Sequence, residues 1–188
     1  MITRCFSIFR FKKHTAKISS CHLYLPSAKR LVSVDLHSSR FLDGSCVLDA
    51  GLSRLTQLTL TGTSVTDAVL LKILEASSGV QVLHLAGTRM SDRCLPKILG
   101  LKKLRYISVP PEDAHGFGRR SAMAIVKNCM ALEAFDCQEG YLFSTMEIYR
   151  IIDCNSNLTS LLIPYSFVDD NILHFIISNL QKLTYLCV

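Results

Sequence analysis

The sequence predicts an α/β solenoid, in which short parallel strands form one curved sheet and helices cover its outer side. Two observations lead to this prediction. An apolar frame recurs along the chain at steps of 24 to 28 residues. Downstream of the frame, the spacing of apolar residues changes from two to about 3.6, which indicates a helix. A unit of one strand and one helix cannot bury its own apolar face, so neighbouring units must stack.

Each frame has apolar residues at its first, fourth and sixth positions, as in Leu55-Thr-Gln-Leu58-Thr-Leu60. Eight frames begin at residues 6, 31, 55, 80, 104, 132, 158 and 183, in steps of 25, 24, 25, 24, 28, 26 and 25. All 24 frame positions are apolar when Cys137 is counted. Because side chains alternate along a strand, the frame residues are expected to point inward and the residues between them to form a concave surface.

Turn and helix-start signals follow the frames in phase. A small hydroxyl residue that can bond the backbone often stands eight positions after the frame begins: Ser39, Thr63, Thr88 and Ser166. Thr66, Ser91 and Asp169 are natural N-caps, each worth about 1 kcal/mol. The Asp that follows each cap suits the positive end of the helix dipole. Pro96 lies too deep for a regular first turn, so its helix is expected to begin late or with a 3-10 turn.

These features resemble the leucine-rich-repeat family over essentially the whole chain, residues 1–188. The resemblance implies a single domain of about seven to eight units, shaped as a segment of a horseshoe like ribonuclease inhibitor. Its parallel sheet would be concave, with the helices on the convex side. The segments Val65-Thr66-Asp67, Met90-Ser91-Asp92 and Asn128-Cys129, followed by Cys137, are similar to the cysteine-containing repeats of F-box/LRR proteins.

The resemblance implies a non-catalytic module that binds proteins. In F-box/LRR proteins such repeats hold a substrate protein while an F-box recruits the Skp–cullin ubiquitin ligase (SCF), which directs ubiquitin-dependent degradation. No F-box is visible in this chain, because its frames begin at residue 6. The main hypothesis is the substrate-binding region of such a receptor. The alternatives are a stand-alone repeat scaffold or adaptor without a ligase link, and an organellar assembly factor.

The candidate protein-binding residues lie between the frame positions of the strands or just after them. They are Arg10, Asp35, His37, Gln57, Thr59, His84, Tyr106, Ser108, Asp136, Gln138, Leu162 and Tyr185. The step of 28 residues contains an insertion rich in Pro and Gly, residues 110–120, expected between a strand and a helix. It is either a longer surface loop or a contact loop, with Phe117 as its anchor, His115 beside it, and Arg119 and Arg120 facing an acidic patch.

The sequence offers no catalytic set and no metal or cofactor motif. An enzyme needs a nucleophile, a base and an orienting group that converge. His84 and Asp136 belong to units two apart and are not expected to meet. The histidines and cysteines lack the spacing of metal ligands. We therefore expect no catalytic residue, no metal and no cofactor.

The net charge of +6 is concentrated at one end. Residues 1–34 contain seven basic residues and no acid, and the remainder contains 14 basic and 15 acidic residues. This balance argues against a nucleic-acid groove along the molecule, because phosphate binding needs clustered Lys and Arg. The basic segment is a solvated face of the first unit, a mitochondrial presequence, or a contact for an acidic partner or lipid surface.

Eight cysteines are scattered along the chain without a CxxC pair. They are typical of reduced, buried thiols in an intracellular protein, cytoplasmic or nuclear, with mitochondria as the alternative. No apolar run approaches the roughly 18–20 residues that cross a bilayer. Both ends are abrupt, which leaves open whether the chain is a fragment of a longer protein, and whether an open sheet edge receives a partner or a second copy.

Overall fold

The computed structural model describes residues 8–10, 31–38, 45–49, 51–110, 116–137 and 143–188. Within them, eight parallel strands form one sheet in sequence order. The strands are β1 (Ile8–Arg10), β2 (Ser33–Asp35), β3 (Gln57–Thr59), β4 (Val82–His84), β5 (Tyr106–Ser108), β6 (Ala134–Asp136), β7 (Ser160–Leu162) and β8 (Tyr185–Cys187). Each strand occupies the third to fifth positions of one frame, so the predicted strands are confirmed.

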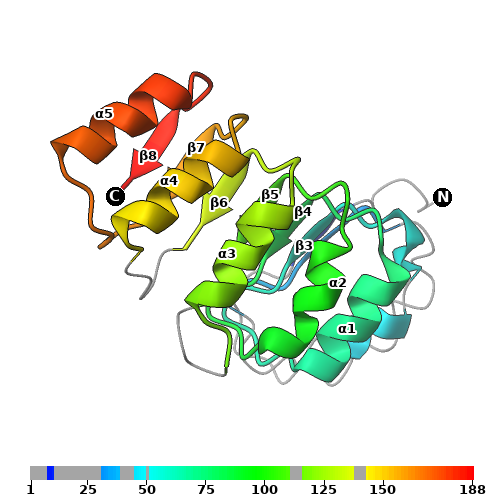
Figure 1. Ribbon diagram of the computed structural model, residues 1–188. Coiled ribbons are helices and arrows are strands. Elements are labelled where there is room, and N and C mark those ends of the chain that lie inside the picture. The colour runs from blue at the N-terminus through cyan, green and yellow to red at the C-terminus, as the bar shows by residue number, and fades with distance from the viewer. Residues whose placement is uncertain (1–7, 11–30, 39–44, 50, 111–115, 138–142) are drawn as a thin grey trace.

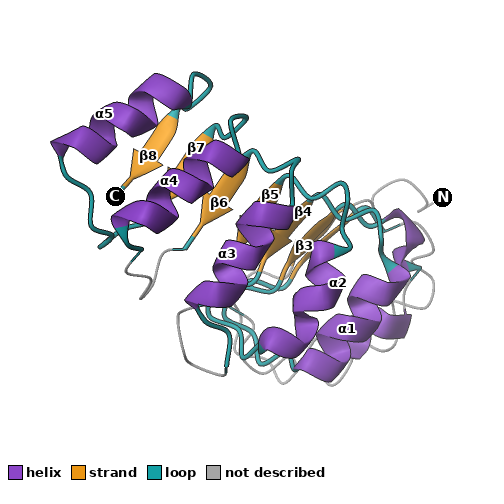
Figure 2. Cartoon of the chain, in the orientation of Figure 1, coloured by secondary structure: helices purple, strands orange, loops and turns teal. Residues whose placement is uncertain are grey.

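The helices all cover the same face of the sheet (Figures 1 and 2). The α-helices are α1 (Asp67–Ala76), α2 (Leu95–Leu99), α3 (Arg119–Asn128), α4 (Thr145–Cys154) and α5 (Asp170–Asn179). Within the described ranges, three 3-10 helices accompany them: η3 (Ser45–Asp49), η4 (Leu52–Arg54) and η5 (Asp92–Cys94). The α/β solenoid with parallel strands and helices on one face of the sheet is therefore confirmed.

The register between strands keeps equivalent frame positions opposite one another. Leu58 pairs with Leu83, and Leu83 pairs with Ile107. Leu58, Leu83 and Ile107 have no exposed surface, as have Phe135 and Leu161 further along the same row. Each such burial contributes roughly 1.5–3 kcal/mol, so the stacked rows form one continuous core. The frame residues of β8 depart from this pattern, since Leu186 is half-buried and Val188 is 42% exposed on the outer strand of the sheet.

The helix starts agree with the sequence in most details. The Asp169 carboxylate accepts a hydrogen bond from the Ile172 backbone N–H at 2.8 Å, and the Ser91 hydroxyl accepts one from the Arg93 N–H at 3.3 Å. The 3-10 helix η5 precedes α2, as Pro96 requires. Thr66 differs, because it holds the N-cap position of α1 but its side chain makes no capping bond.

Polar side chains at the helix starts also join neighbouring units. The Asp67 carboxylate accepts hydrogen bonds from the Ser91 backbone N–H, at 2.8 Å, and from the Ser91 hydroxyl. Although burial opposes the shift, these bonds hold the pKa of Asp67 below its usual value. The Asp92 carboxylate accepts a bond from the Ser121 hydroxyl in the next unit. Two of the three acids assigned from sequence to the helix dipole, Asp67 and Asp92, therefore also bond across the stack.

Candidate functional site

The concave surface is the face of the sheet opposite the helices, and most of its side chains remain accessible. Asp35, Thr59, His84 and Leu162 are half-buried there. Gln57 and His37 are exposed, and Tyr185 is 57% exposed. Arg10 belongs to β1, but its side chain lies outside the described structure, as do Gln138 and His115.

Three of the predicted residues come together on this surface, and we call them the concave cluster: His84, Tyr106 and Asp136. The rings of His84 and Tyr106 lie with their centroids 4.4 Å apart and their planes inclined by 42°. The Tyr106 hydroxyl donates a hydrogen bond of 3.1 Å to Oδ2 of Asp136. His84 and Asp136, expected not to meet, are therefore linked through the residue between them.

The geometry of the parallel sheet explains this bridge. Tyr106 stands opposite Ala134 on the next strand, and Ser108 stands opposite Asp136. The Tyr106 side chain thus reaches diagonally past the small Ala134 to a residue two positions further along. Long aromatic side chains span such diagonals, which are about 7–8 Å between strands. A Tyr at the third frame position, followed by Ala at the third and Asp at the fifth position of the next unit, was the sequence signal for this contact.

Two predicted contact residues at the centre are closed to a partner. Ser108 is only 2% exposed and Asp136 only 5%. The Ser108 hydroxyl accepts hydrogen bonds from the backbone N–H groups of Leu85 and Ala86, at 3.2 and 3.4 Å. Asp136 accepts the bond from Tyr106 described above. The expectation that both side chains lie open on the concave surface is corrected, because their polar atoms serve neighbouring strands.

The surroundings shift the pKa values of two residues in the concave cluster, His84 and Tyr106. Burial lowers the pKa of His84, the nearby His37 lowers it further, and Asp35 opposes the shift. Burial and the Asp136 carboxylate raise the pKa of the Tyr106 hydroxyl. The cluster therefore presents a neutral imidazole beside a protonated phenol that already donates to Asp136. The imidazole touches the phenol ring and not an activated hydroxyl, so this arrangement is suited to contact and not to nucleophilic attack.

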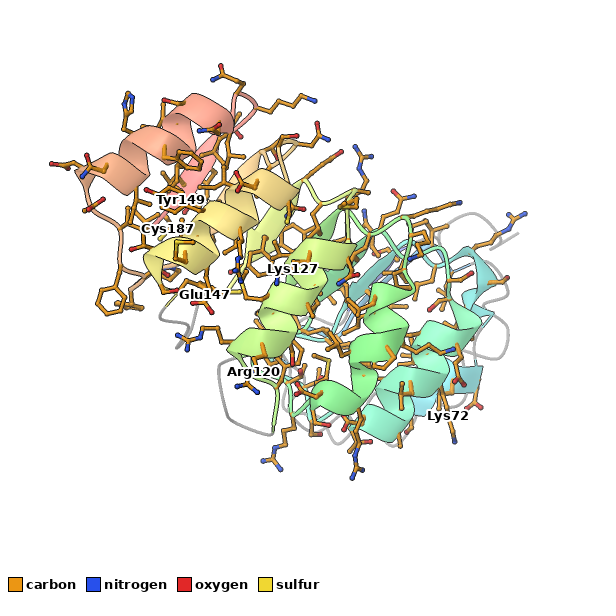
Figure 3. The ribbon with its side chains drawn as sticks, in the orientation of Figure 1. Lys72, Arg120, Lys127, Glu147, Tyr149 and Cys187 are labelled. Atoms are coloured by element: carbon orange, nitrogen blue, oxygen red, sulfur yellow. The ribbon has the colours of Figure 1, made fainter. Side chains whose placement is uncertain are left out.

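The insertion lies between β5 and α3, as predicted, but its anchor is corrected. Phe117 is only 1% exposed and belongs to the hydrophobic core, so it offers no contact to a partner. A ring of this size gains more from burial than it loses in loop flexibility. Arg119 and Arg120 are exposed at the start of α3, and Nε of Arg119 lies 3.4 Å from Oε1 of Glu147 on α4. Arg120 and Glu147 are labelled in Figure 3.

Metal and thiol chemistry find no support in the described part of the chain. There, no three His, Cys, Asp or Glu side chains lie close enough together to hold a metal ion. Burial raises the pKa of the Cys94 thiol to about 12, with the Asp67 carboxylate adding to the shift, and raises that of Cys129 to about 11. Both stay protonated and unreactive near neutral pH. Every described helix is too short or too polar to cross a membrane.

Comparisons with known proteins identify the fold. No protein-family model and no curated protein sequence matches the chain. Among solved structures, it is similar to an internalin (inlF) from Listeria monocytogenes, with a TM-score of 0.56 and 21% identity over 85% of this chain. It is also similar to the mouse RP105/MD-1 complex, with a TM-score of 0.50 and 15% identity over 76% of this chain.

Internalin and RP105 are leucine-rich-repeat proteins, and this chain has the same leucine-rich-repeat fold. The chain spans 42% of the internalin and 23% of the matched mouse chain. At these identities the similarity extends to the fold alone.

Proposed function

We propose that this chain is a non-catalytic protein-recognition module that holds a protein partner on its concave surface. The observation that carries the proposal is the concave cluster together with the accessible residues around it. Tyr106 and His84 are fixed by packing and by the bond to Asp136, so they meet a partner at little cost in side-chain entropy. Tyr is enriched among the residues that dominate binding energy in interfaces.

Photo-crosslinking from the concave surface tests whether a protein partner binds there. A photo-crosslinking amino acid at Gln57 or Tyr185, both exposed on the concave surface, is expected to capture the same protein from cells of the source. The matched control is the same amino acid at Lys72, exposed on α1 at the helix-covered face (Figure 3). Replacing Tyr106 with Ala is expected to reduce capture at Gln57. Equal capture at Lys72, or capture indifferent to Tyr106→Ala, contradicts the proposal.

The finer proposal is that the module binds substrates of an F-box/LRR-type ubiquitin-ligase receptor. The pattern at the helix ends supports it. Cys129 and Asn155 hold the same C-cap position after α3 and α4. Asn155 donates hydrogen bonds to the carbonyls of Val126, in the preceding unit, and Ile151, at 3.0 and 3.2 Å. The Asn155 side chain thereby ties the end of its own helix to the preceding unit.

The ligase link is tested on the complete transcript, sequenced through both ends. Coding sequence upstream that supplies an F-box, with co-purification of a Skp-type adaptor, supports the receptor. An in-frame stop before Met1 and no Skp-type adaptor in the purified complex contradict it.

The same proposal places the protein inside the cell. The buried thiols of Cys94 and Cys129 support a reducing compartment, because disulfides persist mainly in oxidising ones. The mitochondrial alternative is tested by measuring the mass of the mature protein, which reveals whether part of residues 1–34 is removed.

A further inference from the structure

A groove of about 620 Å³ runs along one edge of the solenoid, away from the concave cluster. Its lining residues stand immediately before the frames or at their second positions, where the chain passes from the helices to the strands. Those that matter here are Gln81, Lys103, Arg105, Glu133, Asn157 and Lys182. They come from five successive units, so the groove follows the stack instead of lying within one unit.

The groove carries an excess of positive charge. Arg105 and Glu133 neutralise each other, with Nε of Arg105 2.8 Å from Oε1 of Glu133. Lys103 is exposed, and within the described residues no carboxylate forms an ion pair with it. Lys182 donates a hydrogen bond of 2.7 Å to the neutral amide oxygen of Asn157. Two lysine ammonium groups are therefore left in the groove without an acidic partner in the described structure.

The other polar groups of the groove make it rich in donors. The Gln81 carbonyl already accepts bonds from the backbone N–H groups of Arg105 and Tyr106, at 2.8 and 3.0 Å. The Glu133 carbonyl accepts from the backbone N–H and the hydroxyl of Thr159, at 2.7 and 2.9 Å. With its backbone acceptors occupied, the groove offers mainly the N–H groups of Lys103 and Lys182. A ligand that supplies carboxylate oxygens satisfies these donors best.

The spacing of the two lysines sets the form of the ligand. Lys103 and Lys182 hold the same position, directly before the frame, in units three steps apart along the sheet. Neighbouring strands lie about 4.8 Å apart, so three steps span about 14 Å. An extended chain advances about 3.3 Å per residue, so about four residues cover that distance. The short Ala131 lies between the two lysines in the lining and leaves room for a backbone.

We infer that this groove binds an extended acidic segment of the protein partner, with two Asp or Glu side chains about four residues apart. The inference rests on the proposed function only in assigning the segment to that partner. A peptide fits better than a nucleic acid, because residues 35–188 contain 14 basic and 15 acidic residues and so lack the excess of Lys and Arg that a long polyanion needs.

The probe is the acetylated peptide Gly-Asp-Gly-Ser-Gly-Asp-Gly, titrated into the whole chain and followed by amide shifts in NMR spectra. The expected result is a set of shifts at Gln81, Ala131 and Asn157 that weakens as salt is added. Lys103→Glu and Lys182→Glu are each expected to weaken binding on the order of fivefold, the effect of one exposed ion pair lost and reversed. Lys72→Glu on α1 makes the same charge change outside the groove and is expected to leave binding unchanged (Figure 3).

The following results overturn the inference. The first is the absence of shifts at these amides with all variants folded. The second is binding that ignores the charges of Lys103 and Lys182, or that is equally strong for a peptide with adjacent Asp residues. The third is binding of a phosphoserine version alone, which makes the ligand a phosphopeptide. Loss of peptide binding with crosslinking at Gln57 intact contradicts the groove and leaves the concave proposal standing. Peptide binding without any crosslinking at Gln57 contradicts the concave proposal and leaves the groove standing.

Discussion

The centre of the concave surface differs from its flanks, although the same positions of the repeat form both. At the fifth frame position, Thr59 and His84 are half-buried on β3 and β4, and Leu162 is half-buried on β7. On β5 and β6, between them, Ser108 is 2% and Asp136 5% exposed. The difference teaches that a repeat position fixes the direction of a side chain but not its accessibility, which depends on what the neighbouring unit places beside it.

The largest expected effect is on stability, and it should differ between a side chain that faces the core and its neighbour on the concave side of the same strand. Leu83 has no exposed surface, so Leu83→Asp buries a charge in the core and is expected to unfold the protein, at a cost above about 4 kcal/mol. The neighbouring His84→Asn on the concave side should cost less than about 1 kcal/mol. Thermal melts of both variants measure this. Similar melts for the two would show that the strand phase is wrong.

The next effect concerns the unit that contains the insertion. Phe117 is 1% exposed, so Phe117→Ala is expected to lower the free energy of unfolding by about 3–5 kcal/mol. Arg120 is exposed at the start of the same helix, and Arg120→Ala should change it by less than about 0.5 kcal/mol. Denaturant titrations report both values. A Phe117→Ala variant as stable as the wild type would mean that the ring is a surface anchor after all.

A smaller effect should mark the closed centre itself. Tyr106→Phe removes the donor to the buried Asp136 and is expected to cost about 1–3 kcal/mol. Gln57 holds the same frame position on an open flank, and Gln57→Ala should cost less than about 0.5 kcal/mol. A double-mutant cycle with Asp136→Ala isolates the bond. If the losses in unfolding free energy at Tyr106 and Asp136 were additive, the two residues would not be coupled.

The smallest expected effect is a dependence of stability on pH. It arises from His84 on β4, which lies beside the closed centre on β5 and β6. The pKa of His84 is lowered from 6.5, chiefly by burial, so the unfolded chain takes up this proton at a higher pH than the folded protein. The stability is therefore complete above pH 6.5 and falls as the pH drops below it. His84→Gln should lose less stability than the wild type between neutral and mildly acidic pH. His174→Gln, at an exposed position on α5, serves as the control and should follow the wild type.

The strands and most helix starts could be predicted from sequence because their signals are local. The frame fixes which side of each strand faces the core, and Asp169 and Ser91 bond their own helices. The burial of Phe117 could not be predicted, since a loop bounded by Gly116 and Gly118 carries no periodicity to show which way a ring points. The missing capping bond of Thr66 likewise depends on side-chain placement that residue type leaves open.

The candidate surface could be predicted only in outline. The rows of outward positions follow from alternation, and Gln57 and Tyr185 are accessible as expected. The contact between Tyr106 and Asp136 joins two neighbouring units, so it depends on register as well as pattern. The edge groove escaped the sequence argument because its residues lie outside the strands, where alternation assigns no face.

The bonds between helix starts have a consequence for how such a chain changes over generations. Asp67 bonds Ser91, Asp92 bonds Ser121, and Arg119 lies beside Glu147, so each bond crosses one boundary between units. Stability in such a stack is a sum over neighbouring pairs. A substitution is therefore felt mainly by the units beside it. One outward position can drift toward a new partner while distant units keep the old contacts, so specificity evolves unit by unit.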